Sequence, residues 1–196
     1  MNKIDNTQTF VIKQKRALGE IFIGIEQKNK YFIFDENGNQ ILFAHEVNLK
    51  LFWRFFMKPM RPFEIQLTDE QEGVQLIIKR PFKFLFHECE IFLPDGQLLG
   101  SIKWGFAMFR KKYAIYDNNN IEILRLFGPI FKPWTFFISK MGTEVGKLTK
   151  KWSGIVKEVF TDEDNFVLQL TEHISLKEKQ ILLGAIFLID FVYFER

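Results

Sequence analysis

Residues 181–194 read ILLGAIFLIDFVYF, and this stretch decides the fold. It is apolar around the whole circumference of a helix except at Asp190, and charged residues flank it on both sides. A membrane-spanning helix needs about 20 apolar residues, whereas a run of about 10 to 14 is more often a buried core helix. A helix that is apolar on every face suits a position surrounded by protein. We therefore expect a helix at about 177–194 enclosed by the rest of the chain, with a polar partner for Asp190, rather than a membrane span.

The rest of the chain repeats one pattern, in which an alternating or apolar run leads through a polar turn into a second run. Period-two runs joined by Asn, Asp and Gly are the strongest local signal of β-hairpins. About 12 such strands must enclose the apolar helix, and a closed barrel does so without leaving exposed strand edges. We expect a mainly β protein, a closed antiparallel barrel over residues 10–171 with the helix in its lumen. The six expected turns lie at 35–39, 69–73, 94–96, 117–120, near 142 and at 162–165.

Composition narrows the function classes. No linker or low-complexity tract divides the 196 residues, so we expect a single domain. The net charge of +3 is too small to indicate nucleic acid binding, and 24 Phe predict an aromatic core, exposed aromatic anchors, or both. Cys89 is the only cysteine, which excludes an intrachain disulfide and a Cys-based zinc site. Three scattered His and the absence of a phosphate-binding loop indicate that the protein is not an enzyme and has no cofactor.

The first residues bear on localisation. Residues 1–16 are polar and mildly basic and lack the apolar core of a signal peptide. We expect a peripheral protein on the cytoplasmic side of whatever membrane it meets.

Short motifs along nearly the whole chain resemble one family. Residues 29–31 (NKY), 41–46 (ILFAHE) and 61–63 (RPF) begin the series. The most specific blocks are VGKLTKKWSG at 145–154, EVFTDEDNF at 158–166, and LIDF at 188–191 followed by FE at 194–195. Together and in this order they resemble the phospholipid scramblase family. That family is related to the tubby-like fold, a twelve-stranded barrel around a hydrophobic C-terminal helix.

The resemblance implies a function at a membrane. Family members are associated with calcium-stimulated, ATP-independent, bidirectional movement of phospholipids between leaflets, so a phospholipid membrane surface is the expected partner. Two alternatives stay open: a tubby-like module that binds or tethers anionic lipids or phosphoinositides without moving them, and a soluble barrel with an unrelated ligand.

The chain departs from the family in its loops. Eukaryotic members carry cysteine clusters that are thought to be palmitoylated, and this chain has aromatic residues interleaved with Lys and Arg at the matching loops, residues 50–58, 82–86 and 131–134. Such a mixture suits the membrane interface. Phe52, Trp53, Phe55 and Phe56 are therefore candidate membrane contacts. The alternative is that these rings plug one end of the barrel.

The calcium segment is also incomplete. Asp162 and Asp164, with Glu163 between them, match the first acids of the family's calcium segment, which lie at alternate positions, but the later acids are replaced by His173 and Ser175. Three carboxylates in one turn are more often a solvated hairpin turn than a calcium site. Calcium binding is therefore expected to be weak or absent.

A basic run beside Trp152 gives further candidates. Lys147, Lys150 and Lys151 either lie on a solvated strand face or attract anionic headgroups, at about 1 kcal/mol for each basic residue near the surface. Both interpretations stay open.

Overall fold

The computed structural model describes residues 3–15, 30–47, 62–82, 87–105, 111–151 and 165–194. The strands are β1 Thr9–Lys15, β2 Lys30–Phe34, β3 Gln40–Val47, β4 Phe63–Thr68, β5 Val74–Arg80, β6 Glu88–Phe92, β7 Leu98–Gly105, β8 Lys111–Asp117, β9 Glu122–Gly128, β10 Thr135–Lys140, β11 Thr143–Lys151 and β12 Asn165–Leu170. The helices are α1 Lys3–Asn6 and α3 Leu176–Tyr193.

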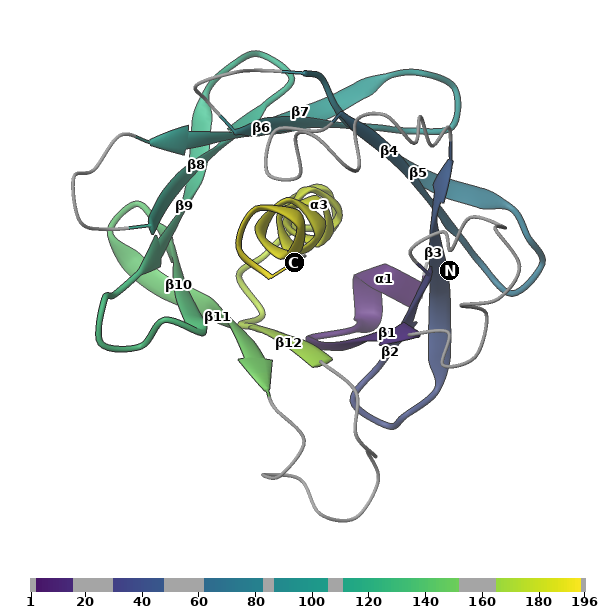
Figure 1. Ribbon diagram of the computed structural model, residues 1–196, viewed down its shortest axis with the longest axis horizontal. Coiled ribbons are helices and arrows are strands. Elements are labelled where there is room, and N and C mark those ends of the chain that lie inside the picture. The colour runs from purple at the N-terminus through teal and green to yellow at the C-terminus, as the bar shows by residue number, and fades with distance from the viewer. Residues whose placement is uncertain are drawn as a thin grey trace, which may run out of the picture.

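Within these residues, twelve antiparallel strands form a closed barrel around α3 (Figure 1). Each strand pairs with its neighbours along the chain, and β1 closes the barrel against β12 with Phe10 opposite Leu168. The expected fold class, a mainly β barrel of twelve strands with a C-terminal helix, is confirmed.

Two strands differ from the expected hairpins. β1 was not among the strands of the six expected hairpins; it pairs with β2 along one edge and, along the other, with β12 at the far end of the chain. The expected turn at 162–165 and the strand expected before it lie outside the described residues, except for Asn165, with which β12 begins. The other five turns join the strands as expected.

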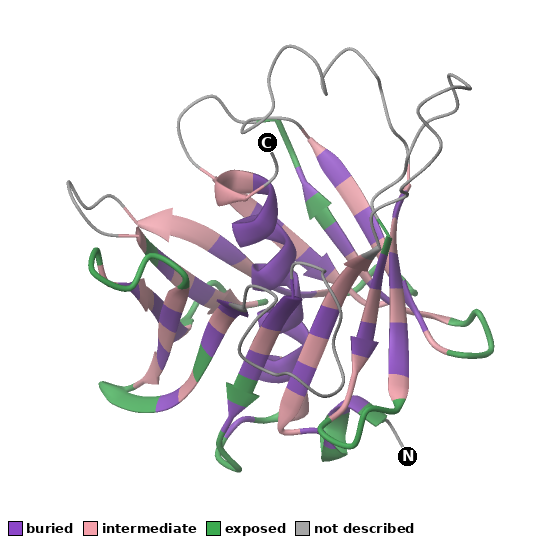
Figure 2. Ribbon diagram, turned by 60° about the horizontal axis from the view of Figure 1, so that its bottom comes forward, coloured by how far each residue is buried: buried purple, intermediate pink, exposed green. Residues whose placement is uncertain are grey.

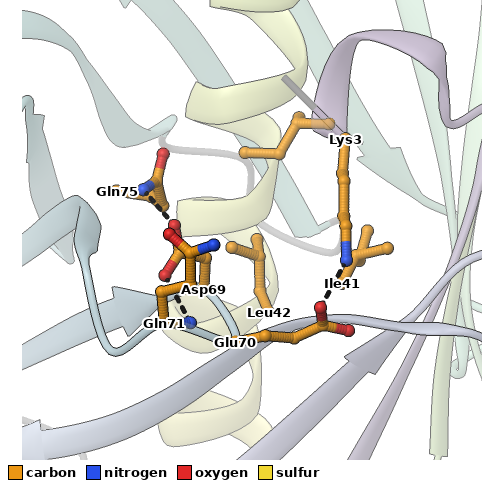
Figure 3. Close-up of a pocket in the computed structure, with 8 residues that line it drawn as sticks. Lys3, Ile41, Leu42, Asp69, Glu70, Gln71 and Gln75 are labelled. Carbon is orange, nitrogen blue, oxygen red and sulfur yellow. Dashed lines mark hydrogen bonds and ion pairs between the residues drawn. The ribbon is translucent and has the colours of Figure 1, made fainter. Parts of the chain in front are cut away.

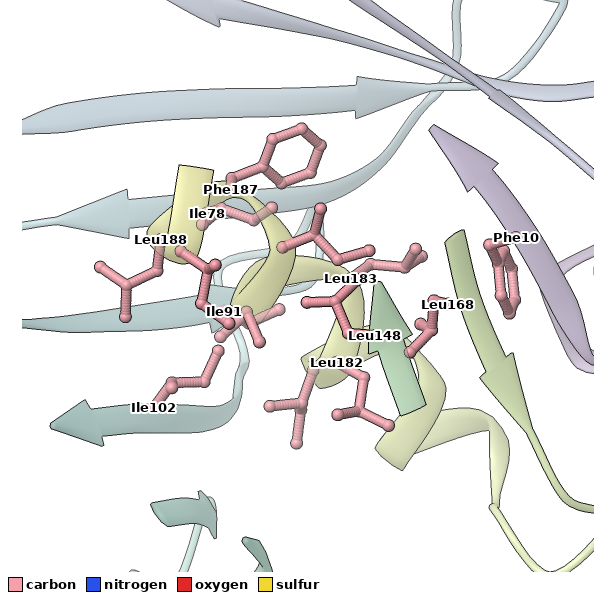
Figure 4. Close-up of a cluster of buried hydrophobic side chains, with 14 of the residues drawn as sticks. Phe10, Ile78, Ile91, Ile102, Leu148, Leu168, Leu182, Leu183, Phe187 and Leu188 are labelled. Carbon is pink, nitrogen blue, oxygen red and sulfur yellow. The ribbon is translucent and has the colours of Figure 1, made fainter. Parts of the chain in front are cut away.

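Alternation along each strand directs apolar side chains into the lumen. In β4, for example, Ile65 and Leu67 are buried while Glu64 and Gln66 face outward. The lumen is filled by α3, whose Leu183 and Phe187 lie among inward-facing strand residues such as Ile78 and Ile91 (Figure 4). A barrel of twelve strands is too wide for strand side chains alone to fill, so α3 completes the core.

The start of α3 is fixed by a capping box. The Ser175 hydroxyl accepts a hydrogen bond from the Glu178 backbone N–H, and the Glu178 carboxylate accepts one from the Ser175 N–H at 2.8 Å. Further along, Gly184 allows close approach to the wall, since a Cβ there would lie 2.7 Å from Cγ1 of Ile91. The helix therefore has a defined start and a defined contact face.

The barrel has two different ends. At one end, called here the turn end, short connections at 35–39, 69–73, 93–97, 117–121 and 141–142 join the strands, and residues 171–175 lead into α3. At the opposite end, called here the loop end, α3 finishes (Figure 2). The connections between strands at this end are longer in sequence. The connection described in full at the loop end is the one between β9 and β10, residues 129–134.

Aspartates close several of the short turns. The Asp35 carboxylate accepts hydrogen bonds from the backbone N–H groups of Asn37 and Asn39, and Asp69 and Asp117 do the same in their turns. These Asp side chains replace backbone partners that the tight turn leaves unsatisfied. The acidity of the turn end is thus partly a consequence of its folding.

Candidate functional site

Asp190 of α3 belongs to a polar cluster inside the barrel. Its Oδ2 accepts a hydrogen bond from the Tyr31 hydroxyl at 2.8 Å, and its Oδ1 lies 3.6 Å from the Lys150 ammonium. Both charged side chains are buried, at 3% and 4% exposure. The expectation that Asp190 meets a polar partner inside the protein is confirmed.

This cluster joins three elements at one depth of the lumen. Tyr31 comes from β2, Lys150 from β11 and Asp190 from α3. The Lys150 ammonium also lies over the rings of Phe194, at 4.2 Å, and Phe166, at 5.0 Å. Removing one partner of a buried ion pair typically costs about 3–5 kcal/mol, because the other charge is left unpaired. The cluster therefore fixes both the rotation and the depth of α3.

Aromatic rings surround the last turn of α3 at the loop end. Tyr193 and Phe194 contact each other, and Trp134 packs against Phe194 with ring centroids 5.0 Å apart. The Lys111 ammonium lies 4.1 Å above the Tyr193 ring and donates a hydrogen bond to the Pro133 carbonyl. Partial burial lowers the pKa of Lys111. This cluster of rings and cations separates the apolar lumen from the loop-end surface.

A second cation lies nearby at the loop end. The Arg80 guanidinium contacts Nδ1 of His87 at 2.7 Å. Because a guanidinium can only donate, this nitrogen must be unprotonated. Burial, with the Arg80 charge as a second cause, lowers the pKa of His87 to about 4. The imidazole is therefore neutral at physiological pH.

Exposed apolar side chains are concentrated at the loop end. Of the six large ones among the described residues, Phe131 is 96% exposed, Ile130 57%, Phe82 41% and Trp134 38%. The two at the turn end are Ile121, at 59%, and Met141, at 99%.

The sequence of the connections differs between the ends in charge as well. The turn-end connections 35–39, 69–73, 93–97, 117–121, 141–142 and 171–175 contain eight carboxylates and no Lys, Arg or aromatic residue. The loop-end connections contain ten Lys and Arg, six carboxylates and fourteen aromatic residues, in residues 16–29, 48–62, 81–87, 106–110, 129–134 and 152–164.

A cavity at the turn end shows how acidic side chains are arranged there (Figure 3). It has a volume of about 460 Å³ and lies between α1 and the turn that joins β4 to β5. Lys3 and Glu70 form an ion pair across it at 2.8 Å, and Asp69 accepts hydrogen bonds from Gln71 and Gln75. The charged residues of its lining are Asp69, Glu70 and Lys3, and Lys3 is already paired with Glu70, so the cavity does not suit the phosphate of a lipid headgroup.

A family model described as Scramblase matches residues 1–196. The chain belongs to the Scramblase family. Phospholipid scramblase 2 of Bos taurus is 33% identical over 199 residues, which cover 94% of this chain and 68% of that protein. Phospholipid scramblase 1 of Mus musculus is 31% identical over 200 residues, and the match covers 61% of its length. This scramblase-family chain thus spans less than two thirds of the mouse protein.

A more distant relative extends the comparison. Altered inheritance rate of mitochondria protein 25 of Saccharomyces cerevisiae is 26% identical over 234 residues, which cover 97% of the scramblase-family chain and 72% of that protein. No solved structure gives a significant match.

Two of the predicted basic residues of this scramblase-family protein lie on opposite faces of β11. Lys147 is exposed on the outer face of β11, whereas Lys150 points into the lumen and is buried. In this conformation Lys150 is turned toward Asp190 and away from the surface on which the basic run suggested a headgroup contact. Strand alternation carries this information, because Lys150 lies two residues beyond the buried Leu148. The side chain of Lys151 lies outside the described part of the chain.

The other predicted site residues lie outside the described ranges. They are Phe52, Trp53, Phe55 and Phe56, the candidate membrane contacts, and Asp162, Glu163 and Asp164, the calcium candidates. In chain order, the four aromatic residues lie between β3 and β4, and the three acidic residues lie between β11 and β12. Their contacts with lipid or calcium stay predictions.

Two further observations concern metals and membranes. Among the residues that the structure describes, no cluster of three or more His, Cys, Asp or Glu could hold a metal ion. In the same part of the chain, no helix has the length and apolar character needed to cross a bilayer.

Sequence reasoning placed residues 131–134 among the loops that suit a membrane interface, but it did not single out Ile130 or Lys111. In a chain with 24 Phe, the sequence gives no sign of which rings are core and which are exposed. The available signal was position: Ile130 and Trp134 lie in a connection that holds Lys and Pro among its apolar residues.

Proposed function

We propose that this protein attaches to the cytoplasmic face of a phospholipid membrane through its loop end and moves phospholipids between leaflets in both directions without ATP. The observation that carries the proposal is the family match over residues 1–196, together with relatives named phospholipid scramblases. The sequence has no phosphate-binding loop that would couple transport to nucleotide hydrolysis.

The chemistry of the loop end supports the membrane part of the proposal. Aromatic side chains at an interface bury their rings below the headgroups, while Lys and Arg reach anionic lipids. Each basic residue near an anionic surface contributes about 1 kcal/mol at ordinary ionic strength. Phe131 and Ile130 next to Lys132 offer this combination on one short connection.

Movement of a phospholipid between leaflets requires a lower free-energy barrier for the passage of its polar headgroup through the hydrocarbon core. A polar group without hydrogen-bond partners in hydrocarbon costs several kcal/mol, so unassisted transfer is slow. Rings and cations that disturb the packing of headgroups would let water and phosphate enter more deeply and lower this cost. In this scheme α3 keeps the barrel intact and does not contact lipid.

A second function is favoured by one observation. Because α3 is buried inside the barrel, the described residues that lipids can reach lie on the outside of the barrel. A protein of this form can bind or tether anionic lipids, phosphoinositides included, without moving them.

Liposomes with a fluorescent phospholipid in both leaflets separate the two functions. Dithionite bleaches the label of the outer leaflet alone, so bleaching beyond that fraction after addition of protein supports lipid movement. Binding to the liposomes without additional bleaching supports tethering. The absence of both rejects a membrane function. Heat-unfolded protein at the same concentration is the control for non-specific leakage.

A further inference from the structure

We propose that residues 129–134, the connection between β9 and β10, enter an anionic phospholipid surface, with the loop end facing the membrane and the turn end facing away. This inference rests on the proposed membrane function and names the contact and the orientation. The connection is called here the β9–β10 wedge.

The wedge presents apolar side chains to solvent. Phe131 is almost fully exposed, and Ile130 and Trp134 are exposed beside it. Removal of such side chains from water is favourable in proportion to the apolar area buried, and a bilayer interface offers that burial.

The wedge is also held in place. The Pro129 carbonyl accepts a hydrogen bond from the Lys132 N–H, and the Lys132 carbonyl accepts one from the Thr135 N–H. The Trp134 carbonyl accepts a hydrogen bond from the Lys150 N–H at 2.8 Å. Because the wedge is already ordered, insertion of its rings costs little conformational entropy.

The positive charges of the wedge and of its base suit an anionic membrane surface. Lys132 lies exposed between Phe131 and Pro133, and the Lys111 ammonium is bound to the Pro133 carbonyl at the base of the wedge. Cations at the foot of an apolar insertion meet the headgroup phosphates when the rings reach the acyl region.

The turn end sets the orientation by repulsion. Its connections hold eight carboxylates and no Lys or Arg. Lys3, Lys140 and Lys177 lie beside them, but carboxylates stay in excess, so an approach by this end to an anionic membrane is unfavourable. A strand of six to nine residues spans more than about 8 Å, the Debye length at physiological salt. Once the loop end is bound, these carboxylates lie more than a Debye length from the membrane surface, so their repulsion does not oppose binding.

A second copy of the chain fits the wedge less well. Ile130, Phe131 and Trp134 expose on the order of 400 Å² together, whereas a stable interface buries about 800 Å² on each partner. We therefore assign the wedge to the lipid surface.

The test compares two double variants with matched exposure. Ile130→Ser/Phe131→Ser removes the apolar tip of the wedge, and Ile121→Ser/Met141→Ser removes two equally exposed side chains from the turn end. Binding is measured by co-sedimentation with vesicles of phosphatidylcholine and phosphatidylserine. We expect the wedge variant to bind at least about tenfold more weakly than wild type, and the turn-end variant to bind within about twofold.

A second measurement reads orientation directly. Because Cys89 is buried and its pKa is raised by burial, an introduced exposed cysteine can be labelled selectively. An environment-sensitive dye at Phe131→Cys should shift to shorter wavelength when vesicles are added, whereas the same dye at Met141→Cys should not.

The other outcomes each reject a distinct statement. If wild type binds vesicles and both double variants bind equally well, the wedge is not the contact, although the membrane function stands. A shift at position 141 alone reverses the orientation and overturns the proposal. Loss of dimers in the wedge variant with unchanged vesicle binding assigns the surface to a second copy. If wild type binds no vesicles, the proposed function and the wedge both fail.

Discussion

The turn end and the loop end close the same twelve strands, but their connections have opposite chemistry. The turn end carries carboxylates and no aromatic residue, and the loop end carries fourteen aromatic residues with an excess of Lys and Arg. At the turn end the composition follows from folding, because Asp35, Asp69 and Asp117 cap tight turns. At the loop end no comparable backbone requirement calls for rings such as Phe131 in water. Exposed residues that folding does not require, such as Phe131, are the first candidates for a functional role.

The largest expected effect tests the barrel on which both ends depend. Ile186→Asp or Phe187→Asp places an unpaired charge in the lumen, where both side chains are buried. A change of this kind costs more than about 4–5 kcal/mol, enough to unfold a domain of ordinary stability. Circular dichroism should show loss of the cooperative thermal transition.

The matched control for this prediction is Ile186→Val, which should cost about 0.5–1.5 kcal/mol and leave the transition cooperative. If the Asp variants stay folded and only lose membrane binding, α3 does not form the core of the barrel and the comparison of the two ends loses its basis.

The next effect concerns the cluster that fixes α3. Asp190→Asn and Lys150→Met should each destabilise the protein by about 3–5 kcal/mol, because the remaining charge stays buried without its ion pair. The double variant Asp190→Asn/Lys150→Met should be more stable than the sum of the two losses predicts. Urea unfolding of the four proteins measures this coupling. Additive losses would show that Lys150 and Asp190 do not act as a pair.

A smaller effect is expected from pH at the loop end. The pKa of His87 is about 4 in the folded protein and its ordinary value is 6.5, so folding favours the neutral ring. The contribution to stability is complete above pH 6.5 and decreases as the pH falls from 6.5 toward 4. Thermal unfolding of His87→Gln should therefore depend less on pH than wild type in that window. Parallel curves for the two proteins would assign the pH dependence to other groups.

Membrane binding is expected to change without loss of stability when the other loop-end aromatics are altered. Trp53→Ser/Phe56→Ser should weaken co-sedimentation with anionic liposomes by about tenfold or more, and the melting temperature should stay nearly unchanged. A drop of several degrees with unchanged binding would place these rings in the core and reduce the difference between the two ends.

The smallest expected effect is that of calcium. Asp162→Asn/Asp164→Asn should not change the heat of titration with millimolar calcium, because the family's later acids are missing from the segment. Micromolar binding that is lost in the double variant would contradict this prediction and would make the loop end a calcium-dependent surface.

The sequence predicted the barrel, the enclosed helix and a partner for Asp190, because each depends on local periodicity or on the cost of a buried charge. It did not reveal β1, whose pairing with β12 joins distant parts of the chain. It also did not reveal the exposure of Ile130 and Phe131, since an apolar residue in a connection can pack inward or face solvent. Lys150, which is buried, shows that alternation within a strand carries information on burial that charge alone does not.

The closure of β1 against β12 has a consequence for biosynthesis. Thr9 pairs with Gln169, and α3, which fills the lumen, is the last of the described elements in chain order. A ribosome therefore exposes nearly every strand before the inner face can be covered, and contacts of such high sequence separation form slowly. The nascent chain presents apolar strand faces throughout synthesis, so its yield should depend on chaperones that shield them until α3 emerges.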